Sequence, residues 1–176
     1  MNTLLNPFRA PSRKGTEWFS VGLASSFPDV GLDESELRLC ANHGAAAQPG
    51  CKVFYAPKTD SPQPTEVGIP TDDVTQDLTD QVLVFQYRGN FHAIDHQCPH
   101  FSYPLSQGIP FDIEDFGIVL SAGLTCPKHN WSFDLFSGRS DRGNYRLKVW
   151  EVQLRELGET QGEDKEVWVR RKPRIG

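Results

Sequence analysis

Two short segments of the chain each place one cysteine and one histidine within a tight turn. They are Cys98-Pro99-His100 and Cys126-Pro127-Lys128-His129, and 25 residues separate His100 from Cys126. The proline after each cysteine fixes φ and removes a backbone N–H group, which helps to hold each loop in one conformation. Metal ligands bind at little entropic cost when they converge before the metal arrives. We therefore expect a fold that brings two rigid loops together.

Two cysteines and two histidines can bind zinc or a [2Fe–2S] cluster, and their order along the chain helps to distinguish the two. A zinc finger pairs cysteine with cysteine and histidine with histidine along the sequence. Here each segment supplies one of each, an order that suits a cluster in which the cysteines bind one iron and the histidines the other. From these residues alone, a structural zinc site stays the alternative.

The rest of the sequence predicts an all-β domain. Its 176 residues include thirteen prolines and fifteen glycines, which favour many turns over a helix bundle. We expect residues 1–15 to form a flexible tail and residues 16–172 to form one domain, with its cluster-binding part at about 95–140. Alternating or β-rich runs predict strands at residues 17–21, 52–55, 81–88, 91–94, 118–120, 124–125, 145–154 and 166–170.

The clearest predicted turn is Gly89-Asn90, between two strands of a hairpin, with glycine in the first position of a type II′ turn. The second strand of this hairpin runs directly into Cys98. Residues 57–80 are expected to form a long loop, and residues 101–117 a second one. The acidic residues of the second loop, which would either dock a reductase or simply be solvated, are Asp112, Glu114 and Asp115.

Charge and hydropathy narrow the partners and the location. The net charge is −5, so nucleic acid is not an expected partner, whereas an acidic surface is compatible with docking a basic patch on a redox protein. No window approaches eighteen apolar residues, and the N-terminus lacks an apolar segment. We therefore expect no transmembrane helix, no secretory signal and a cytoplasmic location, with a mitochondrial one less favoured. In a reducing compartment Cys40 and Cys51 would be free thiols.

The two Cys/His segments and their surroundings resemble the Rieske family. The resemblance is strong over residues 82–138 and weaker over about 16–171. It rests on the hairpin at 84–95, on Cys98-Pro99-His100 with Pro104-Leu105-Ser106 and Gly108, and on Cys126 to Leu135 with Ser137-Gly138. It implies an antiparallel sandwich-like base, a tip of two ligand loops and one [2Fe–2S] cluster.

The same resemblance implies a role for each ligand and its neighbours. Cys98 and Cys126 would bind the buried iron, and His100 and His129 the outer iron, from which electrons would leave. Trp131 would shield the cluster rather than carry electrons, and His92 and His96 would be structural rather than ligands or a proton relay. The residues expected next to the ligands are Pro99, Tyr103, Pro127, Trp131 and Phe133.

The chain departs from the family at several positions. Residues 109–117 look like an insertion, and Asn130 stands where glycine is common, although asparagine tolerates the left-handed region. Tyr103 and Lys128 take the places of the two extra cysteines of respiratory Rieske proteins, so no disulfide should join the loops.

Two further departures concern the redox potential. Trp131 and Phe133 replace a serine and a tyrosine that donate hydrogen bonds in the respiratory proteins, and Ser132 has the wrong alternation to substitute for them. Because hydrogen bonds to cluster sulfurs raise the potential, we expect a low-potential cluster that resembles those of ferredoxins and oxygenases.

The sequence offers no second iron site and no glycine-rich phosphate loop. We therefore expect an electron carrier rather than an enzyme, acting as a soluble Rieske-type ferredoxin between a reductase and an acceptor such as an oxygenase. The alternatives are a small subunit of a larger reductase, like the Rieske-like subunit of nitrite reductases, and the zinc module. Neither nucleic acid nor membrane is an expected partner.

Overall fold

The computed structural model describes residues 16–32, 38–43, 47–58, 61–69, 77–158 and 162–173. These parts consist of strands and loops with two short 3-10 helices, η1 (Ala24–Ser26) and η2 (Leu105–Gln107), which confirms the all-β expectation. No helix within them is long and apolar enough to cross a membrane. The predicted flexible tail, residues 1–15, lies outside the described residues.

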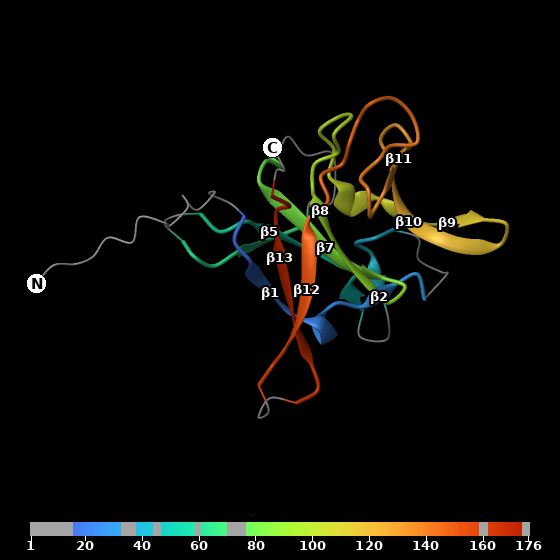
Figure 1. Cartoon of the computed structure of the whole chain (residues 1–176). Helices are drawn as coiled ribbons and strands as arrows, with labels where there is room; N and C mark the ends of the chain where they lie inside the picture. The colour runs from blue at the N-terminus through green and yellow to red at the C-terminus, as the bar shows by residue number, and fades with distance from the viewer. Residues whose placement is uncertain are drawn as a thin grey trace, which may run out of the picture.

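The strands are numbered in chain order (Figure 1). Their bounds are β1 Phe19–Leu23, β2 Asp29–Val30, β3 Asn42–His43, β4 Gln48–Pro49, β5 Cys51–Tyr55, β6 Thr65–Val67, β7 Gln81–Tyr87, β8 Asn90–Asp95, β9 Ile109–Asp115, β10 Ile118–Cys126, β11 Trp131–Asp134, β12 Glu151–Glu156 and β13 Lys165–Arg170.

Strand β7 lies in the largest of the four sheets of the described residues and is buried on both faces; the smallest sheet is the pair β3-β4. A middle sheet contains β5, β7 and β8 together with β2 and β6; a second sheet has the order β1-β13-β12, and a third the order β11-β10-β9. Because side chains alternate along a strand, Val82 and Val84 join the core shared with β1 and β13. Leu83 and Phe85 join the other core, which includes Cys98 and Cys126. Strand β7 therefore anchors both the base of the fold and the tip that carries the two Cys/His segments.

The predicted hairpin exists, but its turn was placed one residue too late. Tyr87 pairs with Asn90, so the two turn residues are Arg88 and Gly89, with φ of 44° and 81°. Positive φ at both positions is the type I′ geometry, which matches the twist of the flanking strands better than the expected type II′ turn. The Gly89 N–H donates to the Asp29 carboxylate over 2.7 Å, and this contact with β2 helps to hold the turn in that register.

The insertion is a strand rather than the expected loop. Residues 109–115 form β9, which pairs along β10 through a turn at Phe116-Gly117, and this hairpin projects from the body of the molecule (Figure 1). The runs 118–120 and 124–125, predicted as separate strands, are one strand with an irregularity between Val119 and Ser121. The apolar residues Ile109, Phe111 and Ile113 do alternate with the residues between them, as in a strand. The expectation of a loop followed the acidic residues of this segment and overlooked the alternation.

Two other boundaries differ from expectation. Strand β6 lies inside the predicted loop 57–80. The last but one strand begins at Glu151 instead of residue 145, because residues 145–150 make only isolated bridges as they pass the tip.

Cys40 and Cys51 form a disulfide with Cα atoms 5.2 Å apart, so the expectation of free thiols was wrong. Cys51 begins β5 and is fully buried, and the Leu39 N–H donates to the Gly108 carbonyl over 2.9 Å. The disulfide therefore fastens residues 38–43 to the middle sheet, next to the segment that follows the first Cys/His pair.

We expect the C40A/C51A variant to lose about 2–3 kcal/mol of unfolding free energy, because the closed loop of about a dozen residues no longer restricts the unfolded chain. Urea denaturation of both proteins, with and without reductant, measures this loss. Reductant should weaken the wild type and leave the variant unchanged. Four titratable thiols in the unreduced, denatured, metal-free wild type would contradict the pairing.

Candidate metal centre

The first Cys/His segment lies in a loop that leaves β8 and is closed at its base. The Cys98 N–H donates to the Tyr103 carbonyl over 2.9 Å, and Gln97 bridges Pro104. Below this closure, the Leu105 N–H donates to the His96 carbonyl over 2.8 Å. The loop is therefore a short excursion whose two ends are joined by the backbone.

The second segment is the turn between β10 and β11. Cys126 pairs with Trp131, and the Asn130 N–H donates to the Cys126 carbonyl over 2.9 Å. Asn130 has a φ of 57°, so it adopts the left-handed conformation expected where relatives carry glycine. The strand pairing and this turn fix the direction in which Cys126 and His129 leave the backbone.

The structure brings the four predicted ligands together in pairs of one kind. The Cys98 and Cys126 thiols are hydrogen-bonded to one another, and the imidazoles of His100 and His129 lie edge to face with centroids 5.1 Å apart. Both cysteines are only 2% exposed, whereas His100 is half-buried and His129 exposed. Within the described ranges, no three Cys, His, Asp or Glu side chains surround a point as ligands of a single ion. A buried thiol pair beside a more exposed imidazole pair fits the donor set of a Rieske cluster.

Backbone N–H groups point at both sulfurs. The hydrogen bond with Cys126 lowers the pKa of the Cys98 thiol to about 6, and the N–H groups of Phe101 and His100 act in the same direction against desolvation. The same contact and burial raise the pKa of Cys126, opposed by the N–H groups of Lys128 and His129. Each cysteine thus faces the N–H groups two and three residues later, an arrangement that stabilises thiolate ligands.

Aromatic rings surround the imidazoles unequally. The ring of Trp131 is half-buried and stacks on His100 with centroids 4.3 Å apart, and Tyr145 packs edge-on against both rings. His129 instead meets the exposed ring of Phe101 at 5.3 Å. Trp131 therefore covers one face of His100, and His129 is the more accessible of the two imidazoles.

Tyr103 and Lys128 lie against each other. The Lys128 Nζ atom lies 5.7 Å from the centre of the Tyr103 ring, so a cation–π contact joins the two loops. These are the two positions at which respiratory Rieske proteins carry their extra cysteines. Phe133 is 1% exposed in the core, and the Ser132 hydroxyl is hydrogen-bonded to that of Thr125 over 2.8 Å. Neither position 131 nor position 133 carries a hydroxyl, as read from the sequence.

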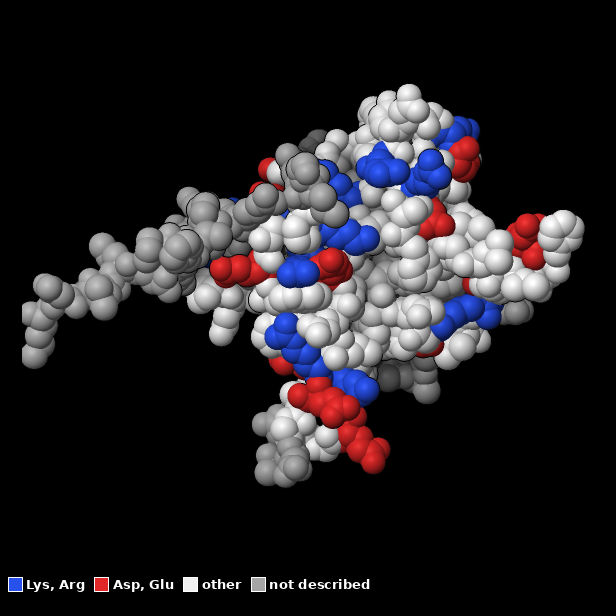
Figure 2. Space-filling view, viewed as in Figure 1, with Lys and Arg blue, Asp and Glu red and all other residues white. Residues whose placement is uncertain are grey.

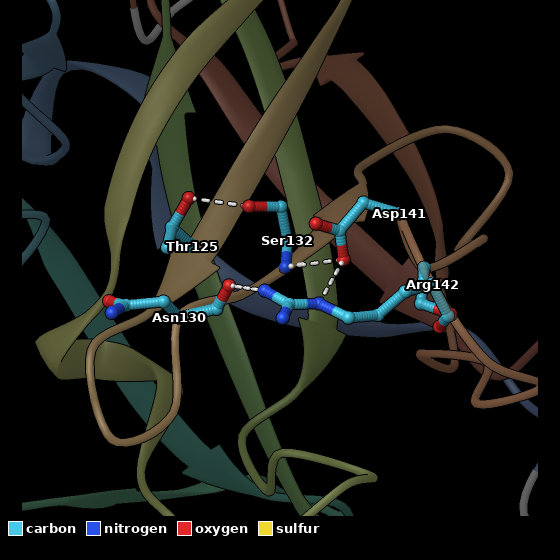
Figure 3. Close-up of polar contacts among 6 residues, drawn as sticks. Thr125, Asn130, Ser132, Asp141 and Arg142 are labelled. Carbon is cyan, nitrogen blue, oxygen red and sulfur yellow. Dashed lines mark hydrogen bonds and ion pairs between the residues drawn. The ribbon is translucent and has the colours of Figure 1, made fainter.

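A third loop, between β11 and β12, clamps the second segment, and the sequence reading missed it. Arg142 donates to the Asn130 carbonyl, and Asp141 accepts from both Arg142 and the Ser132 N–H (Figure 3). Gly143 makes the approach possible, because a Cβ atom there would lie 2.9 Å from the Trp131 ring. A contact between loops leaves no periodic pattern in the sequence, so the sequence alone does not predict this one.

His96 braces the first loop from below. It is fully buried, with Nδ1 2.7 Å from Gln81 Oε1 and Nε2 2.8 Å from the Ser106 hydroxyl. Because the amide oxygen only accepts, Nδ1 carries the proton and Nε2 accepts from the hydroxyl. With both ring nitrogens occupied, His96 has a structural role. His92 lies between Phe85 and Phe136 and is likewise buried.

Comparison with known proteins agrees with this site. Residues 65–151 match the family model of the Rieske [2Fe-2S] domain, and this match implies one [2Fe–2S] cluster.

Two relatives and one solved structure extend the comparison. The chain is 35% identical over 77 residues to a methanesulfonate monooxygenase ferredoxin subunit of Methylosulfonomonas methylovora, covering 42% of this chain and 54% of that protein. It is 37% identical over 59 residues to apoptosis-inducing factor 3 of Mus musculus, covering 33% of this chain and 8% of that protein. The chain thus spans about half or less of these curated relatives. A structure from Mycobacterium tuberculosis, assigned as the small subunit of an NADH-dependent nitrite reductase, shares the fold at a TM-score of 0.51 and 15% identity, covering 90% of this chain and 97% of that one.

We expect the R142M variant to release iron to a chelator several-fold faster than the wild type and to lose about 1 kcal/mol of stability, because the second loop loses its clamp. Absorbance of the iron–bathophenanthroline complex follows the release. R139M, which removes another exposed cation of the third loop, is the matched control. Equal release from R142M and the wild type would show that the clamp does not hold the site.

Stability should fall in acid because of His92. Burial lowers the pKa of His92 to about 4, opposed by the charge of Asp134. Between about pH 6.5 and 4 the unfolded chain binds a proton that the folded chain does not, so this contribution is full above pH 6.5 and lost as the pH falls. Urea titrations from pH 7.5 to 4.5 should therefore show a steeper loss for the wild type than for H92F, by up to about 3 kcal/mol. Parallel curves would mean that His92 is not buried in its neutral form.

Proposed function

We propose that this chain holds its [2Fe–2S] cluster on Cys98, Cys126, His100 and His129 and works as an electron carrier. The observation that carries the proposal is the pairing by type, with buried thiols on the inside and imidazoles toward solvent. One pair of thiols and one pair of imidazoles suit a cluster with one iron on each pair, whereas a tetrahedral zinc site would place all four donors around one ion. When bound, such a cluster accepts and releases one electron at a time.

The chain's own residues would divide the work. Cys98 and Cys126 would hold the inner iron under the N–H groups of their own loops. His100, covered by Trp131 and Tyr145, and His129, open to solvent, would hold the outer iron. The exposed edge of His129 offers a partner the shortest approach to the site.

The proposed role is a ferredoxin-like carrier between a reductase and an acceptor such as an oxygenase, without a substrate site of its own. The likeness to the ferredoxin subunit of a monooxygenase supports this role. A cytoplasmic location is proposed on the same likeness, but the Cys40–Cys51 disulfide counts against it, because disulfides are rare in reducing compartments.

One observation favours a second role, as the small subunit of a larger reductase. The β9–β10 hairpin exposes a row of apolar side chains, with Phe116 97%, Ile118 63% and Leu120 65% exposed. A stable complex buries such a surface, whereas a freely diffusing carrier leaves it in water. Co-purification of an untagged partner in fixed stoichiometry from the native host would favour this role.

Iron analysis and EPR test the proposed site. The purified protein should be reddish-brown, contain two irons and two sulfides per chain, and give a rhombic EPR signal after reduction with dithionite. C98S and H129A should each lose the signal, while C40A/C51A should keep it. A colourless protein with one zinc per chain would overturn the proposal.

The midpoint potential tests the absence of hydroxyl donors near the site. We expect a negative potential for the wild type and a rise of about 60 mV in F133Y, because a hydrogen bond to a charged acceptor is worth about 1.5 kcal/mol and the couple transfers one electron. F136Y, which adds a hydroxyl to an exposed phenylalanine, should not change it. A clearly positive wild-type value would contradict the low-potential assignment.

A further inference from the structure

The residues around the candidate metal centre carry a positive charge, although the net charge of the chain is negative. The chain as a whole carries −5, but the tip, defined as residues 96–108 and 126–149, carries five cations and two carboxylates. One of these carboxylates, Asp134, is half-buried and accepts the N–H groups of Phe136 and Ser137. The exposed cations of the tip are Lys128, Arg139, Arg142, Arg146 and Lys148.

These cations surround an apolar centre. Phe101 is 57% and Tyr145 43% exposed, and Phe101 contacts the exposed ring of His129. A hollow of about 450 Å³ beside the first loop is lined by His100, Phe101, Arg146 and Lys148. Its one carboxylate, Asp95, accepts a hydrogen bond from the Trp150 indole and pairs with Arg171. An apolar centre with a charged rim is the usual layout of a protein-binding surface.

The cationic rim continues away from the loops. A second hollow, of about 410 Å³, shares Arg146 and Lys148 with the first and extends to Arg171 and Lys172. Figure 2 shows blue side chains over the loops at the top of the molecule and red ones at the far end of the β12–β13 hairpin. The described acids at that end are Glu156, Glu163 and Asp164. The molecule is therefore electrically polarised, with the candidate metal centre at its positive end.

The acidic residues that the sequence offered either as a docking site for a reductase or as a solvated turn are not part of this surface. Asp112 accepts a hydrogen bond from Tyr87 over 2.9 Å and pairs with Arg88 at 3.0 Å, so its carboxylate is used within the fold. Glu114 and Asp115 lie at the end of β9 remote from Cys126, because β9 pairs along β10 with Ile109 opposite Thr125 and Asp115 opposite Ile118.

We infer that the tip docks on a carboxylate-rich face of an electron-transfer protein, with Arg146 and Lys148 in the rim that selects it. This inference rests on the proposed function and adds the kind of partner. The partner's surface would be acidic, whereas the negative net charge of the chain suggests a basic one. The positive end would orient the molecule so that His129 faces an acidic partner on approach. A basic partner would be attracted to the opposite end, away from the site.

Two haem proteins of opposite surface charge serve as probes: cytochrome b5, acidic around its haem edge, and cytochrome c, basic around its haem edge. Stopped-flow oxidation of the dithionite-reduced protein should be fast with cytochrome b5 and slow markedly as salt is raised from 10 to 300 mM. With cytochrome c, the oxidation rate should rise or stay the same over the same increase in salt. Amide shifts of [15N]cytochrome b5 titrated with the oxidised protein should report binding without electron transfer.

R146E/K148E should lower the rate with cytochrome b5 by roughly tenfold and abolish the amide shifts. K58E/K165E changes the net charge equally at exposed positions outside the tip residues and should stay within about twofold of the wild type. Equal effects of both variants, or faster oxidation by cytochrome c that slows with salt, would overturn the inference. Uncharged p-benzoquinone should oxidise all three proteins alike. If p-benzoquinone does not oxidise the dithionite-treated wild type, or if the wild type gives no EPR signal, the proposed function is overturned and the docking surface with it.

Discussion

The hydrogen-bonded pair of thiols, Cys98 and Cys126, is the contact on which the site depends. Each cysteine stands at the end of a strand, one after β8 and one closing β10, and both are packed into the core that also holds Leu83 and Phe85 of β7. Their burial fixes how far apart the two loops are. The imidazoles then meet above them, because each leaves its loop two or three residues after its cysteine.

Much of the rest of the fold holds these loops still. His96 joins the middle sheet to the segment after the first loop through Gln81 and Ser106. On the other side, Arg142 and Asp141 hold the second loop from a third one. These supports are hydrogen bonds that join each ligand loop to its neighbours, and loops held in this way reduce the entropic cost of binding a metal.

The sequence predicts the four candidate ligands, the all-β class and the hairpin into Cys98, because these depend on local spacing and on strand patterns. It misses the third loop, since the partners of Arg142 are set by tertiary packing. Residues 109–115 were expected to form a loop because of their acidic side chains, although Ile109, Phe111 and Ile113 alternate as in a strand. The Cys40–Cys51 disulfide was missed because the prediction rested on an assumed reducing compartment and not on the distance between the two cysteines, which the sequence does not give. Net charge also does not give the sign of the charge around the candidate ligands, because the fold decides where the charged side chains gather.

The most direct test of the central claim is pulsed EPR of the reduced protein with and without [15N]histidine. The proposed ligands predict two histidine nitrogen couplings to the cluster that both change to the 15N pattern on labelling. H92F should retain both couplings, because His92 is buried away from the ligands. A cluster signal without histidine couplings, or with only one, would contradict the assignment of His100 and His129.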